Sequence, residues 1–355
     1  MNKNIKKILE KLETMGFKAY LVGGFVRDTL IGRETFDVDI CTNALPKDLF
    51  SIFNADSNNY GGIHLQVSKY NVDITTFRED KNYINRRPSE VIYIDSLEQD
   101  LQRRDFTVNA ICMDKNSKVI DLLNGVEDLN NRTIRMIGDI DTKLKDDPLR
   151  ILRAIRFATV LDFNIDEELY QGLKNNYQLV LTLSKTRIKE ELDKILISSN
   201  YMKGLTILKE LGILELLDIS YKDITYVQDV LGMWSQIDAK NMPFTNNEKK
   251  SIIKIAEVVS LGTINNETLF KYGLYINTIA GLILNVKLND INKMYKNLAI
   301  KERKDINITS QEIISLLNLE NGKKINDIYD DLISKILSNK LKNNNKDIKK
   351  YLQGK

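Results

Sequence analysis

Cysteine, proline and histidine are scarce in this chain of 355 residues, which has two, four and one of them. Cys41 and Cys112 lie in unrelated apolar contexts, with neither a metal-site spacing nor a disulfide framework, which favours a reducing cytoplasm. No apolar run is long enough to cross a bilayer, and residues 1–10 lack the apolar centre of a secretion signal. The sequence therefore predicts a cytoplasmic protein without a membrane partner.

The overall composition is that of a globular protein, with 43% hydrophobic and 28% charged residues. Its length predicts two to four compact units. The net charge of +3 neither requires nor excludes a nucleic-acid partner. The C-terminal segment is locally basic and forms either a nucleic-acid-binding surface or a solvated terminal helix. Its charges are Lys340, Lys342, Lys346, Lys349, Lys350 and Lys355, against Asp347.

Residue patterning divides the chain near residue 140. Before it, short apolar runs end in turn residues and predict strands at 19–22, 36–40, 91–94 and 108–113, and a hairpin joining 65–67 to 72–77. After Pro148 only Pro243 remains, and apolar residues recur at helical spacing in 151–160 and 188–196. We predict an α+β head of roughly 135 residues followed by an all-α remainder.

The first candidate site combines a Gly-Gly turn with paired carboxylates. Asp37 and Asp39 are two apart in a predicted strand and therefore share one face. Two carboxylates at a phosphate site can hold Mg²⁺, which prefers oxygen ligands. Gly23 and Gly24 allow close backbone approach, and Arg27 can pair with a triphosphate. An Asp-x-Asp alone would be a solvated strand face, and no P-loop motif is present.

Two further segments can contribute to this site. Asp73, in the predicted strand 72–77, supplies a third carboxylate if its strand lies beside that of Asp37, and is otherwise a polar residue on an open sheet face. Arg104, Asp105 and Asn109 follow a predicted helix at 97–101 and can bind phosphate and ribose hydroxyls. Their alternative role is an ion pair at a helix–strand junction.

The segment from Asp146 to Arg150 predicts a reader of nucleotide bases. Pro148 at the first helical position makes Asp147 an N-cap, and Arg150 faces the same way as Asp147. The carboxylate only accepts hydrogen bonds and the guanidinium only donates them. This order matches cytosine and adenine, and uracil and guanine present the reverse order. The simpler alternative is a capped helix with a local ion pair.

Together these blocks resemble the class II tRNA nucleotidyltransferases, which share a polymerase-β-like head with bacterial poly(A) polymerases. The segments that match, in the same order, are LVGGFVRDTLIGRETFDVDICT, TTFRED, RRDFTVNAI and DDPLRILRAIRFA. Motif coverage runs from about residue 20 to residue 196. The resemblance implies a nucleotidyltransferase head with a small mixed sheet (1–137), then an all-α neck (138–200), body (201–285) and tail (286–355), with a hinge at 137–139.

The resemblance also implies roles for individual residues. Asp37 and Asp39 would bind catalytic Mg²⁺, and Asp73 would complete the catalytic carboxylates. The implied reaction adds C, C and A to the 3′ end of tRNA from CTP and ATP, and no obligate protein partner is evident. The implied nucleotide-binding residues are Gly23, Gly24, Arg27, Arg104, Asp105, Asn109, Asp147, Arg150, Arg153 and Arg156.

Three positions depart from the family's pattern. Asp146 and Thr186 each stand where the family usually has Glu, and His64 is not followed by the usual Gly-Thr. The change at Asp146 concerns the support of Arg150, and the change at Thr186 concerns one contact of the neck helix. Because His64 is the only histidine, no other is available as a general base.

Two segments distinguish enzymes that add the complete CCA sequence from related poly(A) polymerases and CC-adding enzymes. Residues 53–66 lack the basic block typical of bacterial poly(A) polymerases, and the loop 78–87 has the full length that CC-adding relatives shorten. Both observations favour complete addition. The alternatives are a CC- or A-adding enzyme, a poly(A) polymerase, and a non-catalytic RNA-binding protein on the same scaffold.

Overall fold

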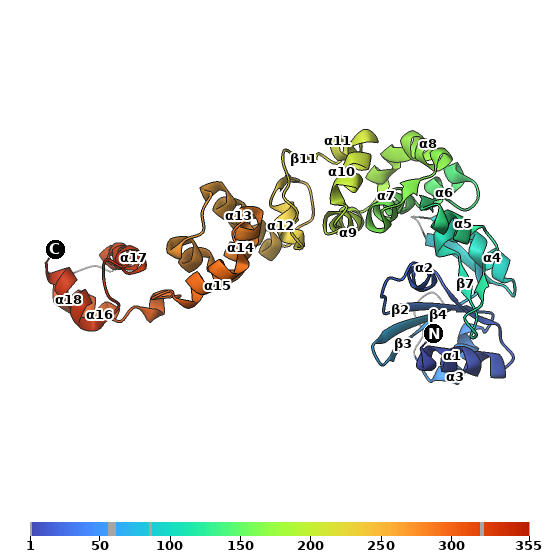
Figure 1. Ribbon diagram of the computed structural model, residues 1–355, viewed down its shortest axis with the longest axis horizontal. Coiled ribbons are helices and arrows are strands. Elements are labelled where there is room, and N and C mark those ends of the chain that lie inside the picture. Colours follow the sequence, from blue (N-terminus) through green and yellow to red (C-terminus); the bar gives the residue numbers. More distant parts are fainter. Residues whose placement is uncertain (1, 56–61, 85–86, 320–322, 355) are drawn as a thin grey trace. The chain divides into compact units, whose positions relative to one another are not determined.

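The computed structural model describes residues 2–55, 62–84, 87–319 and 323–354 (Figure 1). The chain divides after Leu217 into two compact units, residues 1–217 and 218–355, which are considered separately. The comparison of residues 53–66 with poly(A) polymerases falls partly outside the described residues, as does Lys355.

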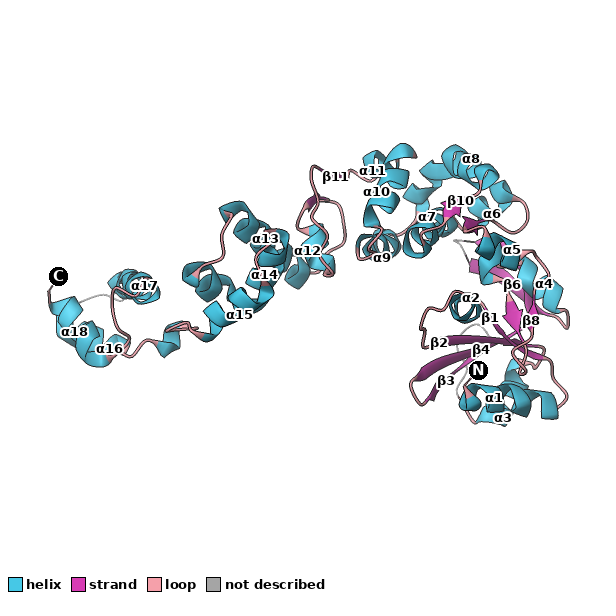
Figure 2. Ribbon diagram, viewed as in Figure 1, coloured by secondary structure: helices cyan, strands magenta, loops and turns pink. Residues whose placement is uncertain are grey.

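The first unit opens with a six-stranded mixed sheet (Figure 2) in the order β3-β4-β2-β1-β7-β8. Only β2 and β4 pair in parallel within it. Helices α1 and α3 cover one face and α2 lies on the other (Figure 1). The strands are β1 (Ala19–Val22), β2 (Asp37–Thr42), β3 (Gly62–Val67), β4 (Tyr70–Thr76), β7 (Cys112–Met113) and β8 (Val119–Ile120), and the helices α1 (Lys3–Thr14), α2 (Gly24–Leu30) and α3 (Pro46–Phe53).

The prediction of a loop at 78–87 is wrong, because residues 78–84 form a strand and residue 87 begins the strand that pairs with it. Strand β5 (Arg78–Ile84) pairs antiparallel with β6 (Arg87–Tyr93), which also extends the strand predicted at 91–94. The polar composition of residues 78–83 obscured this pairing, since strand prediction relies on alternating apolar residues. The predicted helix at 97–101 is present as α4 (Leu97–Gln102).

The strand predicted at 108–113 is also wrong in its first half. Residues Thr107–Asn109 form a turn of 3₁₀ helix, and only Cys112–Met113 pair as β7. Helix α5 (Gly125–Asn130) packs on this turn: a Cβ at Gly125 would lie 2.3 Å from the Thr107 carbonyl oxygen. Close packing therefore overrides the apolar run and turns Asn109 toward the site.

The sequence suggested that Cys41 and Cys112 lie in unrelated contexts, but the structure places them together. Both thiols are free and lie in the same core cluster with Val22 and Phe77. The reason is topological, since β1 separates β2 from β7 and pairs with both. Burial and a hydrogen bond with Cys112 raise the pKa of the Cys41 thiol well above its ordinary value.

The rest of the first unit is mainly helical. The N-cap predicted at Asp147 is shifted by one residue, because Pro148 has helical backbone angles and is itself the N-cap of α7, whereas Asp147 has an extended backbone and ends the preceding helix. Asp147 Oδ1 still accepts a hydrogen bond from the Leu149 amide at 3.2 Å. Helix α7 packs against α9 and α10. The elements are β9 (Thr133–Ile134), α6 (Ile140–Asp146), α7 (Leu149–Leu161), β10 (Asn164–Ile165), α8 (Glu167–Asn176), α9 (Lys185–Leu196), α10 (Tyr201–Glu210) and α11 (Ile213–Leu216).

In its described residues, the second unit is helical apart from the short pair β11 (Ser220–Tyr221) and β12 (Ile237–Asp238). Helix α14 breaks at Gly273, whose φ is +76°, and the fully buried Asn277 donates to the Gly273 and Thr268 carbonyls there. The helices are α12 (Val230–Trp234), α13 (Asn246–Leu261), α14 (Asn266–Ile283), α15 (Leu288–Lys296), α16 (Ser310–Leu317), α17 (Lys323–Leu337) and α18 (Asn345–Gln353).

Across the described ranges, no helix combines the length and apolarity that crossing a bilayer requires.

Candidate active site

The carboxylates of β2 alternate as the strand period requires. Asp37 and Asp39 are exposed on one face, and Val38 between them is buried on the other. Asp37 accepts a hydrogen bond from Asn71 Nδ2 at 2.8 Å. Asp73 sits directly opposite Asp39 in the parallel pairing of β2 with β4, so its strand does lie beside theirs.

The three carboxylates influence one another. Protein atoms around the Asp39 carboxyl group displace part of its water, and this desolvation raises its pKa. The charges of Asp73 and Asp37 raise it further, against the opposing effects of Arg104 and Arg27. Asp73 also lies 3.0 Å from His64 Nδ1. A cation between Asp37 and Asp39 would relieve this crowding of negative charge.

The Gly-Gly turn brings the backbone against these carboxylates. Gly23 has a φ of +74°, which favours glycine, and a Cβ there would lie 3.2 Å from Asp39 Oδ2. A side chain at this position would therefore be strained and would also crowd Asp39. The turn leads directly into α2, which carries Arg27.

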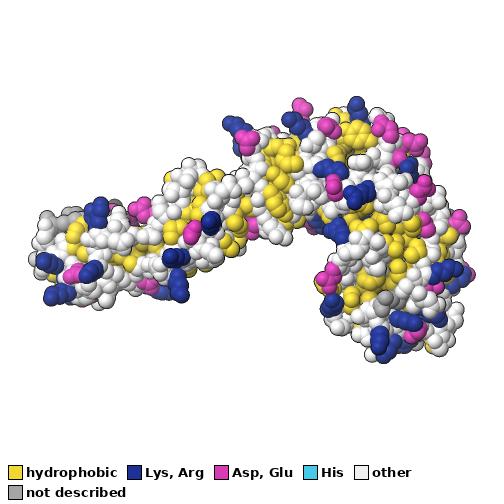
Figure 3. Space-filling model, viewed as in Figure 1, with side chains coloured by type: hydrophobic (Ala, Val, Ile, Leu, Met, Phe, Trp, Pro, Cys, Tyr) yellow, Lys and Arg dark blue, Asp and Glu magenta, His cyan; other side chains and the backbone are white. Residues whose placement is uncertain are grey.

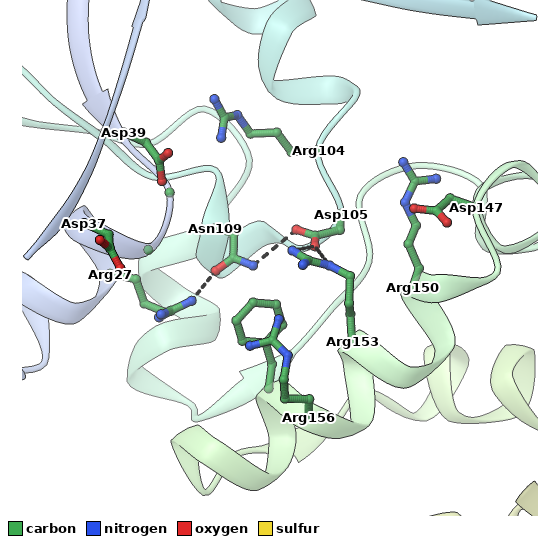
Figure 4. A pocket seen from close by; sticks show the side chains of 13 residues that line it. Arg27, Asp37, Asp39, Arg104, Asp105, Asn109, Asp147, Arg150, Arg153 and Arg156 are labelled. Atoms are coloured by element: carbon green, nitrogen blue, oxygen red, sulfur yellow. Dashed lines mark hydrogen bonds and ion pairs between the residues drawn. The ribbon is translucent and has the colours of Figure 1, made fainter. Parts of the chain in front are cut away.

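A chain of hydrogen bonds joins α2 to α7 (Figure 4). Arg27 Nη1 donates to Asn109 Oδ1, and Asn109 Nδ2 donates to Asp105 Oδ1 at 3.2 Å. Asp105 Oδ2 accepts from Nε and Nη2 of Arg153 at 2.9 and 2.6 Å. Residues 126 positions apart in sequence are thus tied into one polar network.

Asp105 is held in its ionised form by this network. Burial opposes ionisation, but the Arg153 charge, together with hydrogen bonds from Arg153, Asn109 and the Phe106 amide, lowers the pKa of Asp105 from 3.8 to about 2. A depressed carboxyl pKa stabilises the folded state above the unfolded-state pKa, and this stabilisation is lost as the pH falls through the folded-state value.

We predict that Asp105→Asn removes this pH-dependent stabilisation. The full contribution is about 2 kcal/mol near neutral pH, of which about 1 kcal/mol is lost between pH 5 and pH 3. The measurement is the free energy of unfolding in denaturant at both pH values. The wild type should lose about 1 kcal/mol more than the variant on acidification, and an equal loss in both would contradict the assignment.

Arg104 lies between an acidic helix residue and the sheet face that carries Asp37 and Asp39. Its Nη2 is 3.4 Å from Asp100 Oδ2, and Asp100 is fully buried. Arg104 Nε is buried and has no hydrogen-bond partner among the described residues. A guanidinium with an unused buried donor, close to two carboxylates, is suited to receive an anionic ligand.

Arg150, at the start of α7, is only 6% exposed. Its Nη1 donates to the Lys143 carbonyl at 2.8 Å and its Nη2 to the Arg103 carbonyl at 3.4 Å. Two backbone carbonyls therefore hold Arg150 in place. In the family pattern this support is associated with the glutamate that Asp146 replaces here. Lys143 is itself anchored, since its Nζ donates to the Gln102 and Arg104 carbonyls.

A cavity of about 630 Å³ unites these groups, a volume typical of small-ligand sites. It is lined by Asp37 and Asp39 from the sheet and by Asp147 and Arg150 from the start of α7. Asp73 is the one predicted site residue that is absent from the lining of this cavity. Its other lining residues are Gly23, Gly24, Arg27, Arg104, Asp105, Asn109, Arg153, Arg156 and Phe157.

Comparison with known proteins gives three successive family matches. They are the poly A polymerase head domain over residues 19–135, the probable RNA and SrmB-binding site of polymerase A over 162–218, and the putative tRNA nucleotidyltransferase domain 2 over 235–352. The CCA-adding enzyme of Staphylococcus haemolyticus is 31% identical over 387 residues, covering 98% of this chain and 96% of the relative. The chain belongs to the CCA-adding enzyme family.

Other CCA-adding enzymes agree over similar lengths. The one from Lactobacillus helveticus is 32% identical over 382 residues, covering 98% of this chain and 95% of its own. The crystal structure of the Bacillus stearothermophilus CCA-adding enzyme in complex with CTP has the same fold, with a TM-score of 0.85, 24% identity and coverage of 100% of this chain and 98% of that one. A Thermotoga maritima CCA-adding enzyme complexed with tRNA gives a TM-score of 0.68 at 20% identity, covering 99% and 94%.

CCA-adding enzymes, as nucleotidyltransferases, use divalent metal ions. Among the described residues, no three acidic, histidine or cysteine side chains converge into a complete metal cage. The donors present, Asp37 and Asp39, nevertheless fit a magnesium-type site, because such ions are commonly held by one or two carboxylates plus substrate phosphate oxygens and water.

Two residues of this site escaped the sequence analysis. Glu191 on α9 is 4% exposed, and its Oε2 lies 2.5 Å from Arg156 Nε. The family pattern draws attention instead to the neighbouring Thr186, which is exposed. Phe157 lines the cavity, and a signal for it existed, because residues 150, 153 and 157 have the i, i+3, i+7 spacing of one helix face.

Proposed function

We propose that this enzyme adds C, C and A in succession to the 3′ end of tRNA, using CTP and ATP and releasing pyrophosphate. The observation that carries the proposal is the single cavity in which Asp37 and Asp39 lie with the Asp147–Arg150 pair. One part of that cavity suits phosphoryl transfer and another suits recognition of a base. Family membership and the relatives solved with CTP, ATP and tRNA support the same reading.

The residues divide the work by their chemistry. Asp37 and Asp39 would hold Mg²⁺, which lowers the pKa of the attacking 3′-hydroxyl and neutralises charge on the phosphates. Arg27, Arg153 and Arg156 supply guanidinium donors for the triphosphate. Asp105 and Asn109 are placed to meet ribose hydroxyls, and Asp73 is proposed as the third catalytic carboxylate.

Selection of the base rests on Asp147 and Arg150. Both line the cavity, and the two carbonyl contacts of Arg150 fix the direction in which its remaining N–H donors point. Cytosine and adenine each present a donor to the carboxylate and an acceptor to the guanidinium. Uracil and guanine reverse this order and would leave buried groups unpaired, which costs about 1–3 kcal/mol per group.

The remaining chain would bind the tRNA. We propose that residues 138–200 act as a neck, 201–285 as a body and 286–355 as a tail, turning about a hinge at 137–139. Helical surfaces of this kind read the backbone and shape of RNA rather than its bases. We also propose that the protein works in the cytoplasm, where its two free cysteines stay reduced.

The decisive experiment offers each NTP singly, with Mg²⁺, to tRNAs that end before CCA, after CC and after CCA. We expect CTP alone to add two residues to the first, ATP alone to add one to the second, and nothing to be added to the third. Extension of all three by ATP would identify a poly(A) polymerase. Loss of either the C-adding or the A-adding step would identify an A- or CC-adding enzyme, respectively. The absence of any incorporation would favour a non-catalytic RNA-binding protein.

The basic surface of the tail gives a further prediction. Figure 3 shows Lys and Arg side chains on the visible face of the second unit. On α18, Lys346 and Lys350 are exposed, and Ile348 and Leu352 are buried beneath them. Deleting this segment would expose apolar surface, so charge removal is the cleaner test.

Lys346→Gln with Lys350→Gln should weaken tRNA binding and flatten the plot of log affinity against log salt by up to about two units. The measurement is tRNA affinity at several salt concentrations. Lys3→Gln with Lys7→Gln is the matched control, since these exposed lysines have the same spacing on α1. Equal salt dependence in both double variants would make α18 only a solvated end.

A further inference from the structure

One aromatic ring in the cavity is surrounded by three guanidinium groups. The Cζ atoms of Arg156, Arg27 and Arg153 lie 3.9, 5.1 and 5.3 Å from the centre of the Phe157 ring. All three distances fall within the range of about 6 Å in which a cation is attracted to an aromatic ring. Arg27 comes from α2, and the other two share α7 with the ring.

We propose that Phe157 is a positioning residue that holds these three arginines together for the pyrophosphate part of the nucleotide. The inference deepens the proposed function and rests on it only for the identity of the nucleotide. The ring makes no bond to the reacting atoms. It acts by fixing the cations that do meet the phosphates.

The ring itself is held firmly. Phe157 is 7% exposed, and it packs edge-on against the fully buried Phe106, with 5.7 Å between ring centres and an interplanar angle of 78°. An edge-to-face pair of this kind has a preferred geometry that resists rotation. With so little of its surface accessible, Phe157 has no open face on which a base could stack.

Each arginine also forms an ion pair with a carboxylate, in addition to its contact with the ring. Arg27 pairs with Asp28 at 2.9 Å. Arg153 pairs with Asp105 at 2.6 Å, and Arg156 with Glu191 at 2.5 Å. A carboxylate thus fixes one edge of each guanidinium, and the ring fixes its position relative to the others.

Donors remain for a ligand after these contacts. A guanidinium carries five N–H donors. Among the described residues, hydrogen bonds engage Nε and Nη2 of Arg153 and only Nε of Arg156. Arg153 Nη1 and both Nη atoms of Arg156 are therefore available, and both arginines line the cavity.

Without the ring, three like charges would lose their common contact. Leucine keeps most of the apolar volume but has no aromatic quadrupole. Desolvated cation–π contacts contribute about 0.5–2 kcal/mol each. Since the arginines keep their carboxylates, we expect a partial effect, about 5- to 30-fold on the binding of a polyphosphate.

The test measures binding of inorganic pyrophosphate with Mg²⁺ to the full chain by calorimetry, and its inhibition of CTP incorporation. Phe157→Leu should weaken both about 5- to 30-fold and raise KM for CTP similarly. The preference for CTP over UTP and the KM for tRNA should stay as in the wild type. Phe157→Tyr, which retains the ring, should restore most of the pyrophosphate affinity.

Phe163→Leu is the matched control. This ring is 4% exposed, lies just beyond α7 and stacks on none of the described arginines. If Phe157→Leu fails to fold, Phe157→Met is measured in its place. Pyrophosphate affinity equal to that of Phe163→Leu overturns the proposal, and so does a loss of base preference with unchanged pyrophosphate affinity.

The binding measurement separates this inference from the proposed function. Calorimetry needs no tRNA and no turnover. Ring-dependent pyrophosphate binding by a chain that adds no nucleotide to tRNA would refute the proposed function and leave the inference standing. Normal CCA addition with pyrophosphate binding that does not depend on the ring would support the proposed function and refute the inference about Phe157.

Discussion

Asp39→Ala is expected to reduce nucleotide incorporation by on the order of a thousandfold or more, with tRNA binding retained. Asp39 contributes one of the two carboxylates proposed to hold the metal, and alanine cannot replace it. Its side chain is exposed on the sheet face, so its removal opens no hole in the core. Single-nucleotide incorporation and tRNA affinity are measured on the same preparation, with circular dichroism as the check of folding.

Asp73→Ala is the informative comparison, because Asp73 is the direct strand neighbour of Asp39 and yet does not line the cavity. Incorporation reduced as strongly as in Asp39→Ala would support Asp73 as a third catalytic carboxylate. A milder loss would restrict its role to shaping the charge around Asp39. Turnover like that of the wild type in Asp39→Ala would refute the metal assignment itself.

Arg150→Ala is expected to lower the use of CTP and ATP and to narrow their advantage over UTP and GTP by about ten- to a hundredfold. The guanidinium supplies the donors that cytosine and adenine accept. Alanine would also leave the Lys143 and Arg103 carbonyls without this partner, so stability is measured in parallel. All four NTPs are compared on a tRNA that ends before CC.

Asp147→Asn tests the other half of the pair with less structural damage. Asp147 Oδ1 accepts a hydrogen bond from the Leu149 amide at the start of α7, and the side-chain oxygen of asparagine can accept the same bond. The asparagine amide can also present a donor where the carboxylate only accepts, so recognition of the base changes while this bond remains. If both variants kept the discrimination of the wild type, the pair would be a helix cap and the template would lie elsewhere.

Local patterns predicted the parts of this site that local geometry determines. Asp37 and Asp39 share a face because a strand has a period of two, and a helix begins just after Pro148 because proline suits that position. Both inferences need only neighbouring residues. The sequence therefore identified the two ends of the cavity correctly as structural elements, and their catalytic roles stay predictions.

The remaining features depend on contacts between distant segments. The placement of Asp73 beside Asp39 follows from a parallel pairing that no local pattern specifies. Asn109 leaves its predicted strand because it belongs to the 3₁₀ turn on which α5 packs. Phe157 resembles an ordinary core residue until Arg27, from another element, is seen to contact its ring.

The hydrogen-bond chain from Arg27 through Asn109 and Asp105 to Arg153 has a thermodynamic consequence. The same groups that tie α2 to α7 also line the cavity proposed to bind the nucleotide, so formation of the chain and nucleotide binding would be thermodynamically coupled. A nucleotide that binds only when this chain is intact must stabilise it, by about 2.7 kcal/mol at a concentration of a hundred times Kd. Conversely, if tRNA binding loosened the Arg153–Asp105 pair it would weaken nucleotide binding, and nucleotide binding would weaken tRNA binding by the same coupling free energy, since linkage is reciprocal.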